Sequence, residues 1–327
     1  MPSTSSSSYR PSRPAPAQST ASGTNDAGGT SSMFRAPTFI RTIFDKFPLY
    51  SYPVDPSPIN SLDKTPSEQP HDDLFSKNTL YVFSLPGDAQ NCSPSFNPAC
   101  LKWQIYMKIR GVDFRIQSSS NHASPTGSLP FLIVEPARSS VVSGRQLAQT
   151  VPASKLAQWI EDNAAGSVNQ VSSDSPDYRA FSSLVDRNIR DAWLYAMYVD
   201  NTNLNNITVP KYTNSTPLWP VNYLLGLQMR QAALDSLGVN GVGSKVNGEM
   251  LYMRANEAWA ALSALLGDNK WFFSARDAGL FDASVFAYTH LILTLGLERS
   301  GEDLVNGLQQ YSNLIDHEQR IRNKWCT

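Results

Sequence analysis

The stretch Ser118-Ser-Ser-Asn-His-Ala-Ser-Pro-Thr-Gly-Ser-Leu-Pro-Phe-Leu-Ile-Val-Glu135 carries the clearest fold signal in this 327-residue chain. Its first half is polar and contains Pro125 and Gly127, two residue types that favour turns. Its second half contains Phe131–Val134, a short continuous apolar run of the kind that lies inside a sheet. Pro130 precedes this run, and a strand tolerates a residue without an N–H donor at its beginning. The stretch therefore predicts a polar loop that leads directly into a buried strand.

Strands and helices predicted on both sides of this loop follow the order β-α-β, loop, β-β-α. In chain order they are strand 79–85, helix 99–110, strand 113–117, strand 131–134, a strand at Val141-Val142 and helix 153–163. This is the order of a thioredoxin-like domain, which we place at residues 78–165. Such a domain carries a cis-proline at the position of Pro130, so we expect a cis bond there. An ordinary trans turn before an edge strand is the alternative.

The remainder of the chain, residues 172–327, has helical periodicity and predicts an all-helical domain. We expect helices at 178–199, 220–238, 248–267 and 282–295, and one last amphipathic helix that contains Leu304, Leu308, Tyr311, Ile315, Ile321 and Trp325. The helix that begins at Asp282 is apolar nearly all round, yet shorter than the roughly 20 residues of a bilayer span. We therefore predict a buried central helix shared by the two domains. Asp282 caps its start as a structural residue, although Gly279 at the cap position supplies no side-chain acceptor.

The first 77 residues divide into a tail and a linker. Residues 1–36 are rich in Ser, Pro, Thr, Ala and Gly, and we expect a disordered tail because they contain few apolar groups. A mitochondrial transit peptide is the alternative, but the prolines oppose the amphipathic helix that such peptides form. Residues 37–77 combine an amphipathic segment with a proline-punctuated linker. One apolar stripe recurs there at helical spacing, and we predict that it binds a partner protein: Phe39, Ile40, Ile43, Phe44 and Phe47. Packing on the chain's own helical domain or at the membrane interface is the alternative.

Composition excludes several classes of function. The formal net charge is -1 and charged residues make up 17%, so no strong field attracts nucleic acid or an anionic membrane. The three cysteines, Cys92, Cys100 and Cys326, are an odd number without metal-finger spacing, which favours a reducing compartment. We predict no transmembrane segment and no secretory signal.

Two stretches resemble the metaxin family. They are Ser120-Asn-His-Ala-Ser-Pro-Thr-Gly-Ser-Leu-Pro-Phe-Leu132, before the third strand, and Tyr311-Ser-Asn-Leu-Ile-Asp-His-Glu-Gln-Arg-Ile321, in the last helix. The order of a thioredoxin-like domain and an all-helical domain likewise resembles the glutathione transferase fold, an α+β class.

The metaxin resemblance implies a non-catalytic subunit of the sorting and assembly machinery, on the cytosolic face of the mitochondrial outer membrane. The implied partners are the barrel-forming core subunit, a second metaxin-type subunit and β-barrel precursor proteins whose recognition and insertion it assists. Because the chain ends at Trp325-Cys-Thr without an anchor, we expect the peripheral subunit, which associates with the membrane through protein partners.

A working glutathione transferase is the alternative. Such an enzyme needs a Tyr, Ser or Cys after the first strand to stabilise the glutathione thiolate. Cys92 and Ser93 lie in the loop there, but neither stands at a predicted helix start, where the helix dipole would lower a thiol pKa. After the fourth strand, glutathione-using members present an acid and a serine, whereas this chain has Ser143-Gly144. We therefore predict no catalytic residue and no cofactor.

The other candidate motifs favour structural roles. The four histidines lack the spacing of a ligand pair, so we interpret them as surface or core residues and predict no metal: His71, His122, His290 and His317. Gly238–Gly243 is glycine-rich but follows no strand, so it predicts a loop between helices. Asn121-His122 could contact a partner, although polar loop residues more often bond their own backbone.

Overall fold

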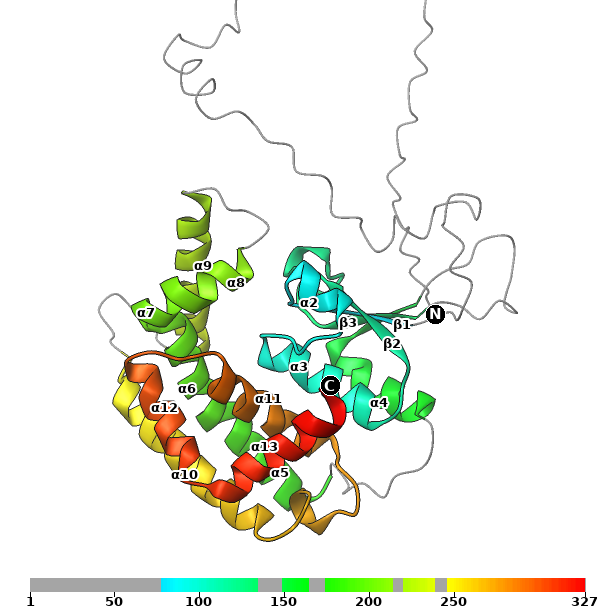
Figure 1. Ribbon diagram of the computed structural model, residues 1–327. Helices are drawn as coiled ribbons and strands as arrows, with labels where there is room; N and C mark the ends of the chain where they lie inside the picture. Colours follow the sequence, from blue (N-terminus) through cyan, green and yellow to red (C-terminus); the bar gives the residue numbers. More distant parts are fainter. Residues whose placement is uncertain (1–77, 135–148, 165–173, 214–219, 239–245, 327) are drawn as a thin grey trace, which may run out of the picture. The chain divides into compact units, whose positions relative to one another are not determined.

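A four-stranded mixed sheet occupies the N-terminal part of the described chain (Figure 1). The computed structural model describes residues 78–134, 149–164, 174–213, 220–238 and 246–326. The strands are β1 (Asn78–Val82), β2 (Phe114–Ser118), β3 (Phe131–Val134) and β4 (Gln149–Pro152), in the spatial order β2-β1-β3-β4. β1 and β2 are parallel, and β3 runs antiparallel to both β1 and β4.

The strand register lines up one apolar row across the sheet. Leu80 lies opposite Ile116 on one side and Leu132 on the other, and Leu132 lies opposite Val151. All four side chains are buried. Since side chains alternate between the two faces of a strand, this row fixes which face of the sheet lies against the core.

The helices of this part follow the predicted order, with two differences. α3 (Pro98–Ile109) connects the parallel strands, and α4 (Ala153–Asn163) has the predicted bounds. A short helix, α2 (Pro86–Gln90), stands where a loop was expected, and a 3-10 turn, η1 (Asn121–Ala123), lies in the loop before β3. Val141-Val142 lies outside the described residues, and the fourth strand is β4. The sheet topology is that of a thioredoxin-like fold, and the Leu129-Pro130 bond is cis, as predicted.

Most of the remaining described residues are helical. In chain order they form α5 (Pro176–Leu184), η2 (Val185–Ile189), α6 (Arg190–Leu194), η3 (Tyr195–Val199), α7 (Asn201–Asn203), η4 (Leu204–Thr208), α8 (Val209–Tyr212), α9 (Val221–Ser236), α10 (Gly248–Leu266), η5 (Phe272–Ser274), α11 (Leu280–Thr294), α12 (Ser300–Gln309) and α13 (Ser312–Trp325). η2, η3 and η4 are π-helical turns, whereas η5 is a 3-10 turn. The prediction of one last helix is wrong, because α12 and α13 are separate. None of the helices in these described ranges is both long and apolar enough to cross a bilayer.

α11 is the central helix, as predicted. It packs on α3 of the sheet-containing part and on α12 and α13 of the helical part. Phe286, Ala283 and Val285 are buried on its different sides, and ten of its fifteen residues are buried in all. A helix enclosed in this way joins the two parts through one continuous apolar core.

Candidate functional site

A cleft of about 690 Å³ lies between the sheet and the helical part. Phe83, Asn97 and the loop residues Ser120–His122 line it from the sheet side. Residues of α6, η3, α8 and α9 line it from the other side, among them Tyr198 and Tyr212. Its size is that of pockets that hold small molecules, so this is where any ligand chemistry has to be tested.

Two tyrosines and an asparagine form the polar floor of the cleft. The Tyr212 hydroxyl accepts hydrogen bonds from Asn97 Nδ2 and from the Tyr198 hydroxyl, each at 2.9 Å. Burial raises the pKa of Tyr198 to about 12 and the pKa of Tyr212 well above its ordinary value. Both phenols are therefore neutral at physiological pH, and they can donate a hydrogen bond but supply no phenolate base.

The thiols near the first strand are equally unsuited to thiolate chemistry. Cys92 is exposed and follows the C-terminal end of α2, away from any helix N-terminus. Cys100, which no sequence motif singled out, lies in the first turn of α3, and burial raises the pKa of its thiol to about 12. At neutral pH this thiol remains protonated and is enclosed by the core.

The hydroxyls beside these thiols have structural roles or are buried. Ser95 Oγ donates to the Phe83 carbonyl at 2.5 Å and accepts from the Asn97 N–H at 3.2 Å. Ser93 donates its backbone N–H to the Asp88 carbonyl at 3.0 Å. Ser84 Oγ is buried without a hydrogen-bond partner among the described residues. No base stands beside any of them in the hydrogen bonds of this region.

The strand-to-helix turn after β4 differs from the expectation. Ser143-Gly144 lies outside the described residues, and the turn after the fourth strand is Pro152-Ala153-Ser154. The described strand that pairs with β3 lies later in the chain than Val141-Val142, a pair that was predicted because of its stronger β-propensity. Ser154 is exposed at the turn, but the acid that glutathione-using members place beside the serine is replaced by Ala153.

The loop before Pro130 bonds its own backbone. Asn121 Oδ1 accepts the Leu129 N–H at 3.0 Å, so the backbone donor next to the cis bond is already satisfied. His122, the next residue, is exposed on the 3-10 turn η1. Asn121 thus hydrogen-bonds to the backbone of its own loop, as polar loop residues commonly do.

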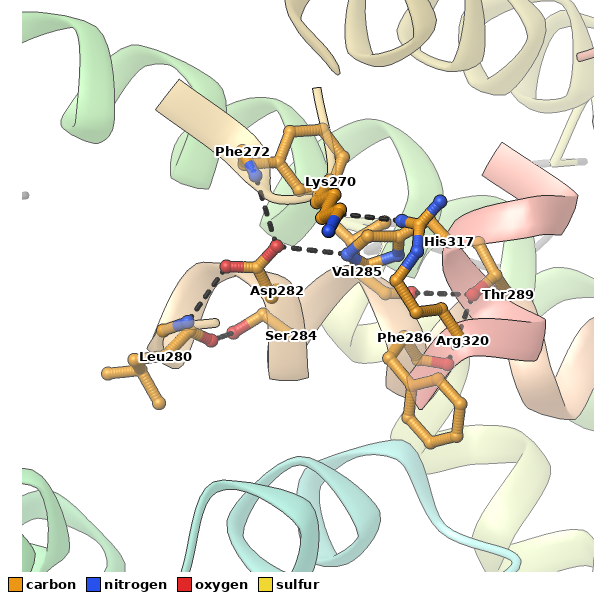
Figure 2. A network of polar contacts seen from close by, with 11 residues as sticks. Lys270, Phe272, Leu280, Asp282, Ser284, Val285, Phe286, Thr289, His317 and Arg320 are labelled. Carbon is orange, nitrogen blue, oxygen red and sulfur yellow. Dashed lines mark hydrogen bonds and ion pairs between the residues drawn. The ribbon is translucent and has the colours of Figure 1, made fainter. Parts of the chain in front are cut away.

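Asp282 is the centre of a buried polar network (Figure 2). Its Oδ1 accepts from the Phe272 N–H at 3.1 Å and from His317 Nε2 at 2.9 Å, and its Oδ2 accepts from the Gly279 N–H at 2.8 Å. Asp282 is 2% exposed and His317 is fully buried. Arg320 on the next turn of α13 donates to the Lys270 carbonyl at 2.7 Å. The network therefore joins α11, α13 and the loop that contains η5, and its role is structural.

A second buried pair lies further along the same two helices. His290 Nδ1 on α11 is 2.8 Å from Glu318 Oε1 on α13, and Arg322 Nε is 3.3 Å from the same oxygen. Glu318 went unnoticed in the sequence, where its only signal was the family-like stretch that contains it. Within the described ranges, no group of three or more His, Cys, Asp or Glu side chains could hold a metal ion.

The predicted partner-binding stripe and one of the four histidines lie outside the part of the chain that the structure describes. They are Phe39, Ile40, Ile43, Phe44, Phe47 and His71.

The sheet with its cis-proline, followed by helices around α11, defines the class of this protein: it has the glutathione-transferase-like fold. Residues 255–321 match the family described as glutathione S-transferase, C-terminal domain. The solved structure of glutathione transferase Omega 2S from Trametes versicolor is similar with a TM-score of 0.43 and 13% identity, covering 77% of this chain and 93% of that chain.

Residues 100–230 match the Tom37 family, described as outer mitochondrial membrane transport complex protein. Metaxin-2 of Mus musculus is 25% identical over 234 residues, which are 71% of this chain and 83% of that protein. The mitochondrial outer membrane import complex protein METAXIN of Arabidopsis thaliana is 22% identical over 243 residues, 74% of this chain and 70% of that protein. The chain is therefore similar in sequence to members of the metaxin family.

Proposed function

We propose that this chain is a non-catalytic subunit of the machinery that assembles β-barrel proteins in the mitochondrial outer membrane. The observation that carries the proposal is the match to the outer-membrane transport family over residues 100–230, together with the metaxin relatives. The chain docks on the cytosolic face of the barrel-forming core subunit, beside a second metaxin-type subunit. There it assists the recognition and insertion of β-barrel precursors.

The chemistry of the candidate catalytic residues supports a binding role over catalysis. Cys100 and Tyr198 keep their protons at physiological pH, since burial raises both pKa values to about 12. The turn after β4 offers Ser154 without an acidic neighbour. A glutathione transferase needs a group that stabilises the glutathione thiolate, and an acid beside a serine that binds glutathione. These residues supply neither a base for the thiol nor that acid.

The domain organisation follows the same proposal. Residues 78–165 form the thioredoxin-like domain and residues 172–327 the all-helical domain, while residues 1–36 and 37–77 are the tail and the amphipathic linker. The stripe Phe39, Ile40, Ile43, Phe44 and Phe47 is the part of the linker that binds the core subunit.

Co-purification tests the proposal directly. The tagged full chain is isolated from outer membranes dissolved in a mild detergent, and its partners are identified by mass spectrometry. We expect the barrel-forming core subunit and a second metaxin-type subunit in stoichiometric amounts. A chain that comes down alone, at a salt concentration that preserves other outer-membrane complexes, contradicts the proposal.

A glutathione-dependent enzyme is the second candidate, favoured by the presence of the 690 Å³ cleft. Its test is retention of the full chain on glutathione resin, combined with turnover of an electrophile. We expect neither. Retention that is lost on adding free glutathione, with turnover above the buffer rate, would establish the enzyme instead.

A further inference from the structure

The buried residues of α9 are small, whereas several of its large apolar residues are exposed. Gly226 and Ala233 are its buried residues. Val221, Tyr223, Leu224 and Leu227 are 39%, 58%, 55% and 45% exposed. The other exposed large apolar residues of the described chain are two methionines of α10. A contiguous apolar surface of this kind marks an interaction site more often than an isolated exposed leucine does.

The helix is firmly attached at its inner side. A Cβ atom on Gly226 would lie 3.0 Å from Val209 Cγ2, so α9 packs closely on α8 (Figure 1). Near its end, Ser236 Oγ accepts from Arg190 at 2.8 Å, and Arg230 hydrogen-bonds to Asn201. The exposed side chains therefore belong to a fixed helix that loses little backbone entropy when a partner binds.

The exposed face carries no charge, which identifies the kind of partner. Between Lys211 and Arg230 the sequence contains no charged residue. Lys211 lies over the Phe96 ring at 5.6 Å, and Arg230 is bonded to Asn201, so both flanking cations contact the protein itself. An interfacial lipid-binding helix typically presents several lysines or arginines to the headgroups, and α9 has one arginine and one aspartate. The surface therefore fits an uncharged apolar protein face better than a membrane.

We propose that the exposed face of α9, defined by Val221, Tyr223, Leu224 and Leu227, binds an apolar helix of another subunit of the same outer-membrane complex. Tyr223 and Leu227 are four residues apart and Leu224 and Leu227 three apart, so they form the ridges that a second helix packs against. Tyr223, the most exposed of the four, is the natural anchor residue, since tyrosine is enriched among interface hot spots. This inference rests on the proposed function and adds the docking surface to it.

The test changes the face without changing the fold. In the full chain, Leu224→Gln and Leu227→Gln are combined, because glutamine keeps helix propensity while removing the apolar surface. The matched control is Met250→Gln with Met253→Gln on α10, where the methionines are 42% and 55% exposed. We expect the α9 variant to lose at least about tenfold in recovery of its partner subunit, with an unchanged Tm, and the α10 control to match the unaltered chain. A photo-crosslinker at Tyr223 should then label a helical segment of that subunit.

The outcomes separate this inference from the proposed function. If the unaltered chain recovers no subunit, the proposed function fails. If it recovers its partners and the α9 variant recovers them equally, only the docking surface is wrong. Two further measurements use the purified chain alone. The first is flotation with vesicles of phosphatidylcholine, phosphatidylethanolamine and phosphatidylinositol. If the unaltered chain floats and the α9 variant does not, the face binds lipid. A dimer in sedimentation velocity that the variant disrupts would assign it to a second copy. Either result overturns the inference.

Discussion

Asp282 illustrates how one side chain can organise three segments of a chain. A carboxylate that is 2% exposed is costly to bury unless its oxygens are hydrogen-bonded. Here Gly279, Phe272 and His317 all donate to it. The sequence predicts Asp282 as a cap weakened by Gly279. The capping bond to the Gly279 N–H is present, and the other oxygen connects α11 to η5 and α13.

Replacing Asp282 should therefore cost more than the loss of a helix cap. Asp282→Asn keeps the shape but turns one acceptor oxygen into an NH₂ donor, which would face an N–H group and leave it without an acceptor. We expect a loss of at least about 2 kcal/mol in the free energy of unfolding, measured by urea denaturation. Ser284→Ala is the control, since the Ser284 hydroxyl only bonds back to the Leu280 carbonyl of its own helix. Equal stability of the two variants would refute the role of the network.

Burial of acidic protons predicts a loss of stability at alkaline pH. Burial raises the pKa of Cys100 from 9.0 to about 12 and that of Tyr198 from 10.0 to about 12. Below pH 9 both groups are protonated in the folded and the unfolded chain, so their contribution is fully present. As the pH rises from about 9 towards 12, only the unfolded chain releases the protons, and stability falls by up to about 1.4 kcal/mol per pH unit for each group.

The measurement is the denaturation midpoint between pH 8 and pH 11. Cys100→Ser, which ionises in neither state over this range, should make the decline shallower. A midpoint that stays constant across the range in the unaltered chain would contradict the prediction.

At the scale of single elements, the sequence predicts the bounds of a strand or helix best where an apolar pattern begins directly after a proline. β3 has the predicted bounds because an apolar run follows Pro130, and α4 has them because its apolar stripe begins directly after a proline. β4 was missed because, of its four residues, only Val151 is buried, so its position depends on pairing with β3. Local sequence carries no information about such a tertiary contact.

Two features of the helical part have no local signal. α12 and α13 are separated at Gln310 and Tyr311, neither of which is a glycine or proline, so the apolar spacing continues across the break. The π-helical turns η2 and η3 lie within the predicted helix 178–199, and they shift the phase of its faces without interrupting it. Periodicity alone finds such a helix but not its internal turns.

Gly248 at the start of α10 provides a test of packing between elements. A Cβ atom there would lie 2.3 Å from Tyr195 Cε1 and 2.4 Å from its Cζ, so the tyrosine ring would have to move. We expect Gly248→Ala to destabilise the protein by about 1 to 3 kcal/mol, as overpacking of a core does. Thermal unfolding followed by circular dichroism measures the effect.

Two companion variants establish the cause. Gly87→Ala introduces the same methyl group where no atom lies within 4 Å, so it should leave stability unchanged or slightly higher. Combining Gly248→Ala with Tyr195→Leu should cost less than the sum of the two single changes, because the smaller side chain gives the methyl group room. Strict additivity would show that the methyl group does not contact the ring.

At the scale of the whole molecule, the sequence predicts the fold class, whereas its prediction of no catalytic residue was argued from an incomplete set of candidate thiols. Cys92 and Ser93 were considered because they follow the first strand, whereas the thiol in a helix N-terminal turn is Cys100. Its burial, which raises the pKa, depends on contacts with distant residues and cannot be read locally. The cleft was not predicted, and α9 was predicted as a helix without its exposed apolar face, since an exposed apolar helix has the same periodicity as a buried one.

The stripe at residues 39–47 gives the prediction with the widest consequence. Its five large apolar side chains would each gain roughly 1.5 to 3 kcal/mol from burial, so an exposed stripe is unfavourable and needs a covering surface. Its nearby cations are Arg35, Arg41 and Lys46, too few for strong attraction to anionic lipid. If the stripe binds the barrel-forming core subunit, then Phe39→Ser, Ile43→Ser and Phe47→Ser together should release the chain from the complex and leave its Tm nearly unchanged.

The control replaces two residues of the same segment that lie off the stripe, Arg41→Ser with Asp45→Ser, which removes one charge of each sign. This control chain should remain in the complex, so that loss of assembly can be assigned to the apolar face and not to the segment as a whole. The opposite pattern, a strongly lowered Tm with assembly retained, would show that the stripe packs within its own chain. Because the α9 face and the stripe lie far apart in the sequence and can be changed separately, measuring both variants in one co-purification determines whether the complex is held by one of these surfaces or by both.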